Sequence, residues 1–132
     1  MSKRPILVVD DDPTILATVS DALDMEGFSV LTATNGAEAL DVIDKISRPS
    51  LVLLDMRMPV LDGWGFMGAL RERGLSLSVV VMTAAADARR WGREIGAHGV
   101  LAKPFELDEL LAAVQRFRVV APCPPVNPEG AS

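Results

Sequence analysis

Short runs of consecutive apolar residues recur along the chain and alternate with longer amphipathic segments. Most of these runs are apolar at successive positions, and do not alternate between apolar and polar residues. Strands of a parallel sheet have this pattern because helices cover both faces of the sheet. We therefore predict five strands, at Ile6 to Val9, Val30 to Ala33, Leu51 to Leu54, Val79 to Met82 and Val100 to Ala102.

The segments between these runs have apolar residues at helical spacing and carry signals for helix ends. In the first segment Asp12 suits the N-cap and Pro13 the first helical position, and Gly27 is expected to end the helix. On one face between these limits lie four apolar residues, Ile15, Leu16, Val19 and Leu23. Further helices are predicted from about Asn35 or Gly36 through Ile46, from Phe66 through Leu70 to near Gly74, from Ala88 through Trp91 and Ile95 to near Gly96, and from Leu107 to Phe117.

The predicted strands and helices alternate with short links. Because connections between parallel strands are right-handed, this order predicts a doubly wound α/β fold, a five-stranded parallel sheet in a flavodoxin-like (βα)5 three-layer sandwich. In such folds, ligands bind beyond the carboxyl ends of the strands. We expect one domain over residues 1–118 and a flexible, proline-rich tail over residues 119–132, which is a chain end, a docking peptide or the start of a linker.

Length and composition agree with a single globular domain. The chain has 132 residues, of which 49% are hydrophobic and 23% charged, close to the average for globular proteins. Its apolar runs are much shorter than the roughly 18 residues that a membrane-spanning helix needs, and we find no signal peptide, so a cytoplasmic location is expected. Cys123 alone can form neither an internal disulfide nor a metal cage, and a net charge of −5 disfavours direct binding to nucleic acid.

Charged and polar residues stand at the carboxyl ends of four predicted strands. Asp10 and Asp11 follow the first strand and Asp55 the third. Thr83 follows the fourth strand and Lys103 the fifth. Because the carboxyl ends of parallel strands meet at one edge of a sheet, we expect these side chains to share a pocket.

The chemistry of these residues suits a phosphoryl group and a metal ion. Two carboxylates about 5 Å apart repel each other by roughly 3 kcal/mol at an effective dielectric near 20, so a cation is needed. Mg²⁺ is the oxygen-binding ion that such a site favours. Lys103 supplies a second positive charge for a phosphoryl oxygen, and the Thr83 hydroxyl can donate to another. Asp55 is ionised at neutral pH and could attack phosphorus without a general base, to give an acyl phosphate.

Four segments in the same order resemble the response-regulator receiver domains of two-component signalling, of the single-domain chemotaxis type. They are ILVVDDDP at residues 6–13, LVLLDMRMP at 51–59 with DG at 62–63, VMTA at 81–84, and LAKPF at 101–105. Each motif is weak alone, but together and at this spacing they are specific. The resemblance covers about residues 4 to 118.

This resemblance implies that the chain takes a phosphoryl group on one aspartate and thereby switches the binding of a partner. The donor would be a phosphohistidine on a sensor histidine kinase or a phosphotransfer protein, or a small-molecule phosphodonor. The implied roles are phosphoacceptor for Asp55, metal ligands for Asp10, Asp11, Asp55 and the backbone carbonyl of Arg57, with Asp11 more direct than Asp10, switch hydroxyl for Thr83 and phosphate contact for Lys103.

The chain departs from the family at Val100, three residues before the pocket lysine, where the family often has an aromatic switch residue. The response to phosphate would then rest on Thr83 and the adjoining loop, residues 84 to 90. The output partner is expected on the face made by the fourth helix, fifth strand and fifth helix. We also expect a cis peptide bond between Lys103 and Pro104, which would aim the ammonium group into the pocket.

Three other functions fit the sequence less well. A phosphohydrolase that forms an aspartyl phosphate would need a general acid, but Arg57 stands where the aspartate-based phosphatases have a second aspartate, so we do not expect turnover of an external substrate. A constitutive adaptor would be expected to lose acidic or lysine positions, and none is lost. A flavodoxin-like cofactor site would need a phosphate loop rich in Ser, Thr and Gly after the first strand. Outside the pocket, we expect Trp64 near its rim, Trp91 partly in the core, and His98 facing solvent or a helix end.

Overall fold

In the computed structural model, the described residues are 4–46, 48–56, 60–75, 77–84 and 97–117. The elements in chain order are β1 (Ile6–Val9), α1 (Pro13–Met25), β2 (Val30–Ala33), α2 (Gly36–Lys45), β3 (Leu51–Asp55), α3 (Gly63–Glu72), β4 (Val79–Ala84), β5 (Gly99–Lys103) and α5 (Leu107–Phe117). The strands form one parallel sheet in the order β2-β1-β3-β4-β5. The predicted α/β fold class is confirmed. The predicted fourth helix and the tail from residue 119 lie outside the described residues, as do Arg57, Trp91 and Cys123.

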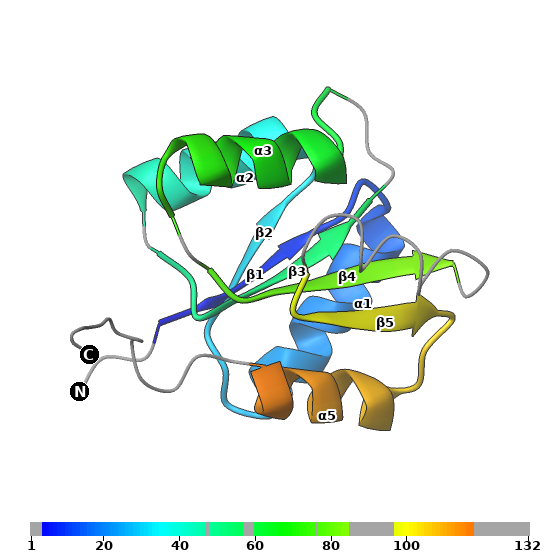
Figure 1. Ribbon diagram of the computed structural model, residues 1–132. Coiled ribbons are helices and arrows are strands. Elements are labelled where there is room, and N and C mark those ends of the chain that lie inside the picture. Colours follow the sequence, from blue (N-terminus) through cyan, green and yellow to red (C-terminus); the bar gives the residue numbers. More distant parts are fainter. Residues whose placement is uncertain (1–3, 47, 57–59, 76, 85–96, 118–132) are drawn as a thin grey trace, which may run out of the picture.

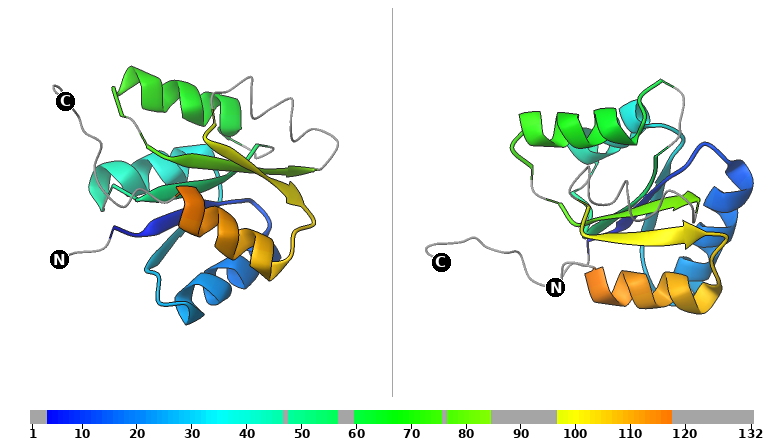
Figure 2. Two further views of the ribbon diagram at one scale, coloured as in Figure 1. Left: turned by 60° about the horizontal axis from the view of Figure 1, so that its bottom comes forward. Right: turned by 45° about the vertical axis from the view of Figure 1, so that its right-hand side comes forward.

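Helices cover both faces of the sheet, with α2 and α3 on one face and α1 and α5 on the other (Figure 1 and Figure 2). Successive residues of a strand point to opposite faces. Leu7 and Val9 therefore pack with α2 and α3, and Ile6 and Val8 pack with α1 and α5. This two-sided burial explains why the inner strands are apolar at successive positions up to their carboxyl ends.

The edge strands are less buried than the three inner ones. Every residue of β1 and β3 is buried, whereas β2 and β5 each contain partly buried and exposed residues. Strands β3, β4 and β5 also run one or two residues further than predicted, because Asp55 pairs with Met82 and Lys103 pairs with Ala84. The polar residues at these ends thus belong to the strands and are held by the sheet.

Capping side chains fix where the helices begin. Asp12 accepts a hydrogen bond from the backbone N–H of Thr14 at 2.9 Å, as predicted for this N-cap. Asn35 caps α2 through the N–H of Glu38 at 2.8 Å, and the Glu38 carboxylate accepts from the N–H of Thr34, an arrangement similar to a capping box. These caps hold the starts of α1 and α2 beside the carboxyl ends of the strands.

Of two predictions away from the pocket, the one at Ile46 is wrong in detail and the one at His98 is confirmed. Ile46 was placed in the apolar stripe of the second helix, but α2 ends at Lys45 and Ile46 is 65% exposed as the C-cap. His98 was expected to face solvent or a helix end, and it is exposed. Its Nδ1 also accepts a hydrogen bond from the backbone N–H of Val79 at 3.2 Å, a contact that was not predicted, next to the bond from its own N–H to the Val79 carbonyl at 2.8 Å. His98 thus extends the pairing of β4 and β5 at their amino ends.

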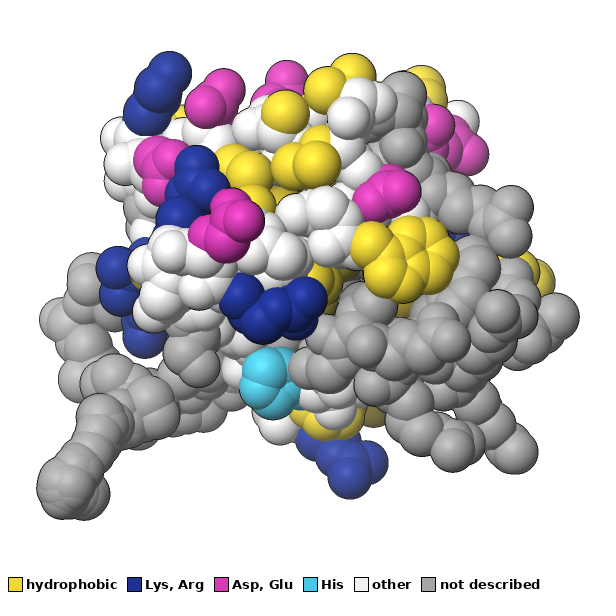
Figure 3. All heavy atoms as spheres, turned by 45° about the horizontal axis from the view of Figure 1, so that its top comes forward, with side chains coloured by type: hydrophobic (Ala, Val, Ile, Leu, Met, Phe, Trp, Pro, Cys, Tyr) yellow, Lys and Arg dark blue, Asp and Glu magenta, His cyan; other side chains and the backbone are white. Residues whose placement is uncertain are grey.

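Charges on the α2–α3 face are mixed. Acidic and basic side chains lie next to each other there, with hydrophobic side chains between them (Figure 3). One pair is Arg73 and Asp44, whose Nη2 and Oδ2 atoms are 3.2 Å apart. Among the described residues, no helix is both long enough and apolar enough to cross a membrane.

A close contact at Gly36 joins the start of α2 to the loop that leads into α3. The N–H of Gly36 donates to the Leu61 carbonyl at 2.9 Å, and a Cβ atom at Gly36 would lie 2.6 Å from that same oxygen. Alanine favours helices more than glycine does. Here, however, we expect Gly36→Ala to lower the free energy of unfolding by about 1–3 kcal/mol, because the added methyl group meets backbone and cannot be accommodated by a rotamer change.

Gly68, inside α3, is the matched control for this prediction because a Cβ atom there would meet no atom within 4 Å. Gly68→Ala should raise the free energy of unfolding by about 0.5–1 kcal/mol through helix propensity alone. Urea denaturation of both variants measures the difference. Equal stabilisation by the two substitutions would contradict the close contact at Gly36.

Candidate functional site

Three carboxylates meet at the carboxyl edge of the sheet. Asp10 directly follows β1, Asp11 is next in the chain, and Asp55 is the last residue of β3. One carboxylate oxygen from each lies within 4.8 Å of the others. Asp10 and Asp55 are buried while Asp11 is exposed. The structure therefore brings together the three acidic residues that the sequence predicted to converge.

Lys103 lies against two of these carboxylates. Its Nζ atom is 2.9 Å from Oδ2 of Asp10 and 3.6 Å from Oδ1 of Asp55. From the sequence, Lys103 was predicted to contact a phosphoryl oxygen, and its hydrogen bond to Asp10 was not predicted. The composition of the strands does not predict the Lys103–Asp10 hydrogen bond. That bond depends on how far the lysine side chain extends from β5 toward β1.

Burial and charge act in opposite directions on Lys103. Burial lowers the pKa of its ammonium group, but the hydrogen bond to Asp10 and the charges of Asp55 and Asp10 outweigh that effect and raise the pKa above its ordinary value of 10.5. The lysine is therefore fully charged at neutral pH. It offsets part of the repulsion among the carboxylates.

Both oxygens of the Asp10 carboxylate have partners within the protein. Oδ1 accepts from the backbone N–H of Asp12 at 2.9 Å, and Oδ2 accepts from Lys103. Because Asp12 also caps α1, the bond to its N–H links Asp10 to the start of that helix. Asp10 is thus held in one orientation by the fold, whereas Asp11 faces solvent.

Two further predicted site residues, Thr83 and Val100, lie on β4 and β5. Thr83 is 4% exposed and is one position beyond Met82, the sheet partner of Asp55. Val100 is paired with Val81 and is 38% exposed. The predicted cis peptide bond before Pro104 is confirmed. Arg57, whose carbonyl was predicted as a ligand, lies outside the described residues.

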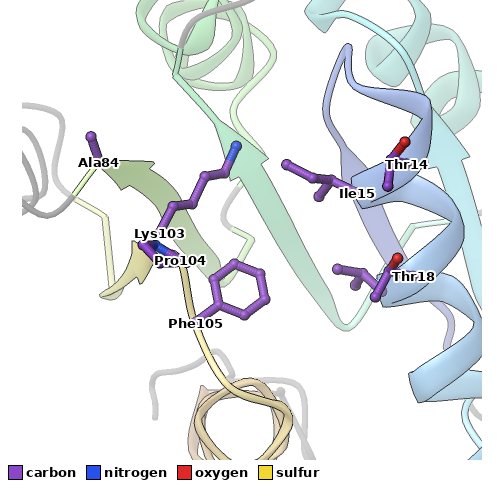
Figure 4. Close-up of a pocket in the computed structure, with 8 residues that line it drawn as sticks. Thr14, Ile15, Thr18, Ala84, Lys103, Pro104 and Phe105 are labelled. Carbon is purple, nitrogen blue, oxygen red and sulfur yellow. The ribbon is translucent and has the colours of Figure 1, made fainter.

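A hydrophobic groove of about 410 Å³ lies beside Lys103, a feature that the sequence analysis missed. Thr14, Ile15 and Thr18 of α1 form one wall, and Pro104 and Phe105 form the opposite wall (Figure 4). The Lys103 side chain runs past the groove toward the end of β3 (Figure 4). The groove and the acidic pocket therefore share Lys103 as a boundary. Only the apolar residues that flank the DDDP and KPF segments could have pointed to it.

The ion pairs of Lys103 have a testable dependence on pH. Because the pKa in the folded protein is raised, the stability from these pairs is fully present below pH 10.5 and is lost as the pH rises through the folded value. We expect the difference in unfolding free energy between wild type and Lys103→Met to shrink over that range in urea titrations at successive pH values. Arg73→Met is the control, because its exposed pair with Asp44 contributes little and arginine keeps its charge. A wild-type minus Lys103→Met difference that is constant with pH would mean that Lys103 acts through its aliphatic stem.

Comparison with known proteins agrees with this geometry. The profile of the response regulator receiver domain matches residues 6–115. The transcriptional regulatory protein PrrA of Mycobacterium tuberculosis is 45% identical over 112 residues, or 83% of this chain, which spans about half (48%) of that relative's length. Sporulation initiation phosphotransferase F of Bacillus subtilis is 36% identical over 119 residues, which are 89% of this chain and 95% of that protein.

A solved structure shares the fold as well. The chemotaxis protein CheY4 of Vibrio cholerae matches with a TM-score of 0.78 and 32% identity, over 88% of this chain and 99% of that chain. Sequence profile, relatives and fold lead to the same family. The chain therefore belongs to the response regulator receiver domains, the signalling domains of two-component systems.

Proposed function

We propose that this receiver domain accepts a phosphoryl group on Asp55, beside a Mg²⁺ ion, and that phosphorylation switches the binding of a partner. The observation that carries the proposal is the cluster of Asp10, Asp11 and Asp55 oxygens within 4.8 Å of one another, with Lys103 against two of the three residues. The repulsion among crowded carboxylates costs stability, and a bound cation would offset that cost.

The donor set fits Mg²⁺. The described part of the pocket contains three carboxylates and one lysine. Its net charge is therefore negative, and the cluster still favours a further cation. Asp11 is exposed and suits direct coordination, whereas both oxygens of Asp10 already have protein partners. By family resemblance the Arg57 carbonyl would be a further ligand. When bound, the ion would neutralise the phosphoryl oxygens as charge builds on them.

Besides the metal ion, three residues of the chain would each have a role in phosphoryl transfer. A carboxylate oxygen of Asp55 attacks phosphorus, the new P–O bond forms as the P–N bond to the donor imidazole breaks, and the electron pair of that bond stays on nitrogen. Lys103 offsets charge on the transferred oxygens, and the Thr83 hydroxyl donates to one of them. With no general acid assigned, we propose acceptance and slow loss of phosphate and no turnover of an external substrate.

The donor would be a sensor histidine kinase or a phosphotransfer protein. The groove between α1 and Pro104 supports this, because it gives the apolar side chains of such a protein a place to dock within reach of Lys103. The output partner would bind the face of the fourth helix, β5 and α5, where Val100 is partly exposed. We propose a cytoplasmic location, with no direct contact of this domain to membrane or nucleic acid.

The phosphoacceptor assignment can be tested by intact mass. With acetyl phosphate and Mg²⁺, the wild-type mass should rise by one phosphoryl group, and Asp55→Ala should abolish the gain because it removes the nucleophile. Asp44→Ala is the control, since this carboxylate lies at the end of α2 and pairs with Arg73. Phosphorylation of Asp55→Ala to the wild-type level would show that another residue is the acceptor.

Metal binding can be tested by thermal unfolding. At an Mg²⁺ concentration about ten times its Kd, binding to the folded state adds about 1.4 kcal/mol, which raises the melting temperature by roughly 4–8 °C. Asp11→Asn should remove most of this response. Asp12→Asn is the matched control because asparagine also caps helices, so α1 is preserved and the Mg²⁺ response should remain. A wild-type melting temperature that does not change with Mg²⁺ would contradict the site.

A further inference from the structure

Val60, in the loop between β3 and α3, has an unusual backbone conformation. Its φ is 70°, in the left-handed region that is costly for residues with a Cβ atom and most unusual for β-branched ones. The other positive φ values among the described residues belong to Gly27 and Gly74, which stand just after helix ends. Strain of this kind persists only where the surrounding structure enforces it, and it concentrates at functional sites.

Contacts on both sides of Val60 enforce the conformation. The N–H of Gly63 donates to the Met56 carbonyl at 3.1 Å and closes the loop on itself. The N–H of Gly36 holds the Leu61 carbonyl, directly after Val60, at 2.9 Å. The backbone is therefore clamped to β3 and to α2.

Contacts of the Val60 side chain within the described structure do not offset this strain. It is 82% exposed, so it buries little apolar surface of its own. Glycine at this position would remove the strain and leave almost every contact of the chain in place. The chain thus keeps an exposed apolar side chain at a site where stability alone would favour glycine.

The position of Val60 indicates what could contact it. Asp55 ends β3, and the Gly63–Met56 bond ties together the two ends of the segment that follows it, so Val60 belongs to the connection that begins at the carboxyl edge of the sheet. Trp64, at the start of α3, is 41% exposed. Hydrophobic side chains are visible among the charged ones on the neighbouring α2–α3 face (Figure 3). Any protein that brings a phosphoryl group to Asp55 must cover this edge of the sheet.

We propose that Val60 is a specificity-determining contact for a protein phosphodonor, whose apolar surface packs on the valine side chain during phosphoryl transfer. The inference rests on the proposed function, because it assumes that Asp55 accepts the phosphoryl group. The donor is the occupant that must approach this edge, whereas an output partner is free to bind elsewhere. A small phosphodonor such as acetyl phosphate has no apolar surface for Val60 and should be indifferent to it.

The experiment compares the two kinds of donor on two variants. Val60→Gly removes both strain and side chain, and Val60→Asn keeps a side chain that tolerates positive φ but is polar. Both should phosphorylate from acetyl phosphate at the wild-type rate, and their melting temperatures should be equal to or above that of wild type. Transfer should be measured from the autophosphorylated histidine kinase that reacts fastest with wild type in a panel of purified kinases. That rate should fall roughly fivefold or more in both variants, as for truncation of a central interface contact.

Val60→Leu and Ile46→Asn are the controls. Leucine restores an apolar side chain and should recover most of the transfer rate from the kinase. Ile46 is also β-branched and 65% exposed, but it lies at the end of α2 with a negative φ, so Ile46→Asn should leave transfer unchanged.

Each other result overturns the proposal in an identifiable way. Unchanged transfer from the kinase in both variants shows that Val60 is not a donor contact. Equal loss with acetyl phosphate and kinase shows that the loop acts by placing Asp55. A lower melting temperature shows that the side chain packs within the molecule. If acetyl phosphate does not phosphorylate the wild type, that result contradicts the proposed function itself, and the inference about Val60 falls with it.

Discussion

The structure depends on a concentration of negative charge at one edge of its sheet. Carboxylate oxygens of Asp10, Asp11 and Asp55 lie within 4.8 Å of one another, and Asp10 is fully buried. At that distance each pair of charges repels by about 3 kcal/mol at an effective dielectric near 20. Lys103 is the compensating cation in the described part of the pocket, with its Nζ atom 2.9 Å from Asp10 and 3.6 Å from Asp55. The fold must therefore bring Lys103, at the end of β5, next to Asp10, which follows β1, although β3 and β4 lie between these two strands.

The apolar core makes the contact between Lys103 and Asp10 possible, because it holds the sheet together. Helices on both faces bury the inner strands except at Ala84, and the pairing of Asp55 with Met82 and of Lys103 with Ala84 fixes the ends of β3, β4 and β5. Hydrophobic burial across two helical layers supplies free energy far larger than the repulsion of a few charges. The domain can thus hold an unfavourable electrostatic arrangement that a smaller or one-sided sheet would relax.

The parts predicted from sequence are those that follow from local pattern and from the geometry of parallel sheets. Apolar runs indicated the strands, Asp12 and Gly27 indicated the limits of α1, and the common edge of parallel strands placed the three aspartates together before any contact was known. The Lys103–Asp10 bond, the groove beside Pro104 and the clamp between Gly36 and Leu61 were not predicted, since each joins segments far apart in the chain. The error at Ile46 has a local cause. Its apolar character continued the helical pattern, but the helix had already ended at Lys45.

The floor of the pocket and its rim differ in how well they can tolerate amino-acid substitutions. The floor consists of strand ends and of Asp10, which is held by Lys103 and by the backbone of Asp12, so a substitution there disturbs both charge balance and sheet. The rim consists of α1, the segment at Pro104 and Phe105, and the loop at Val60, where side chains are exposed or line a groove. Changes at the rim alter what can dock and leave the floor intact. A family built on this plan can therefore keep one chemistry while its members diverge in partners. The strained conformation at Val60 illustrates the limit of that freedom, because the backbone of the rim is still clamped to β3 and α2, and only its side chains are left to vary.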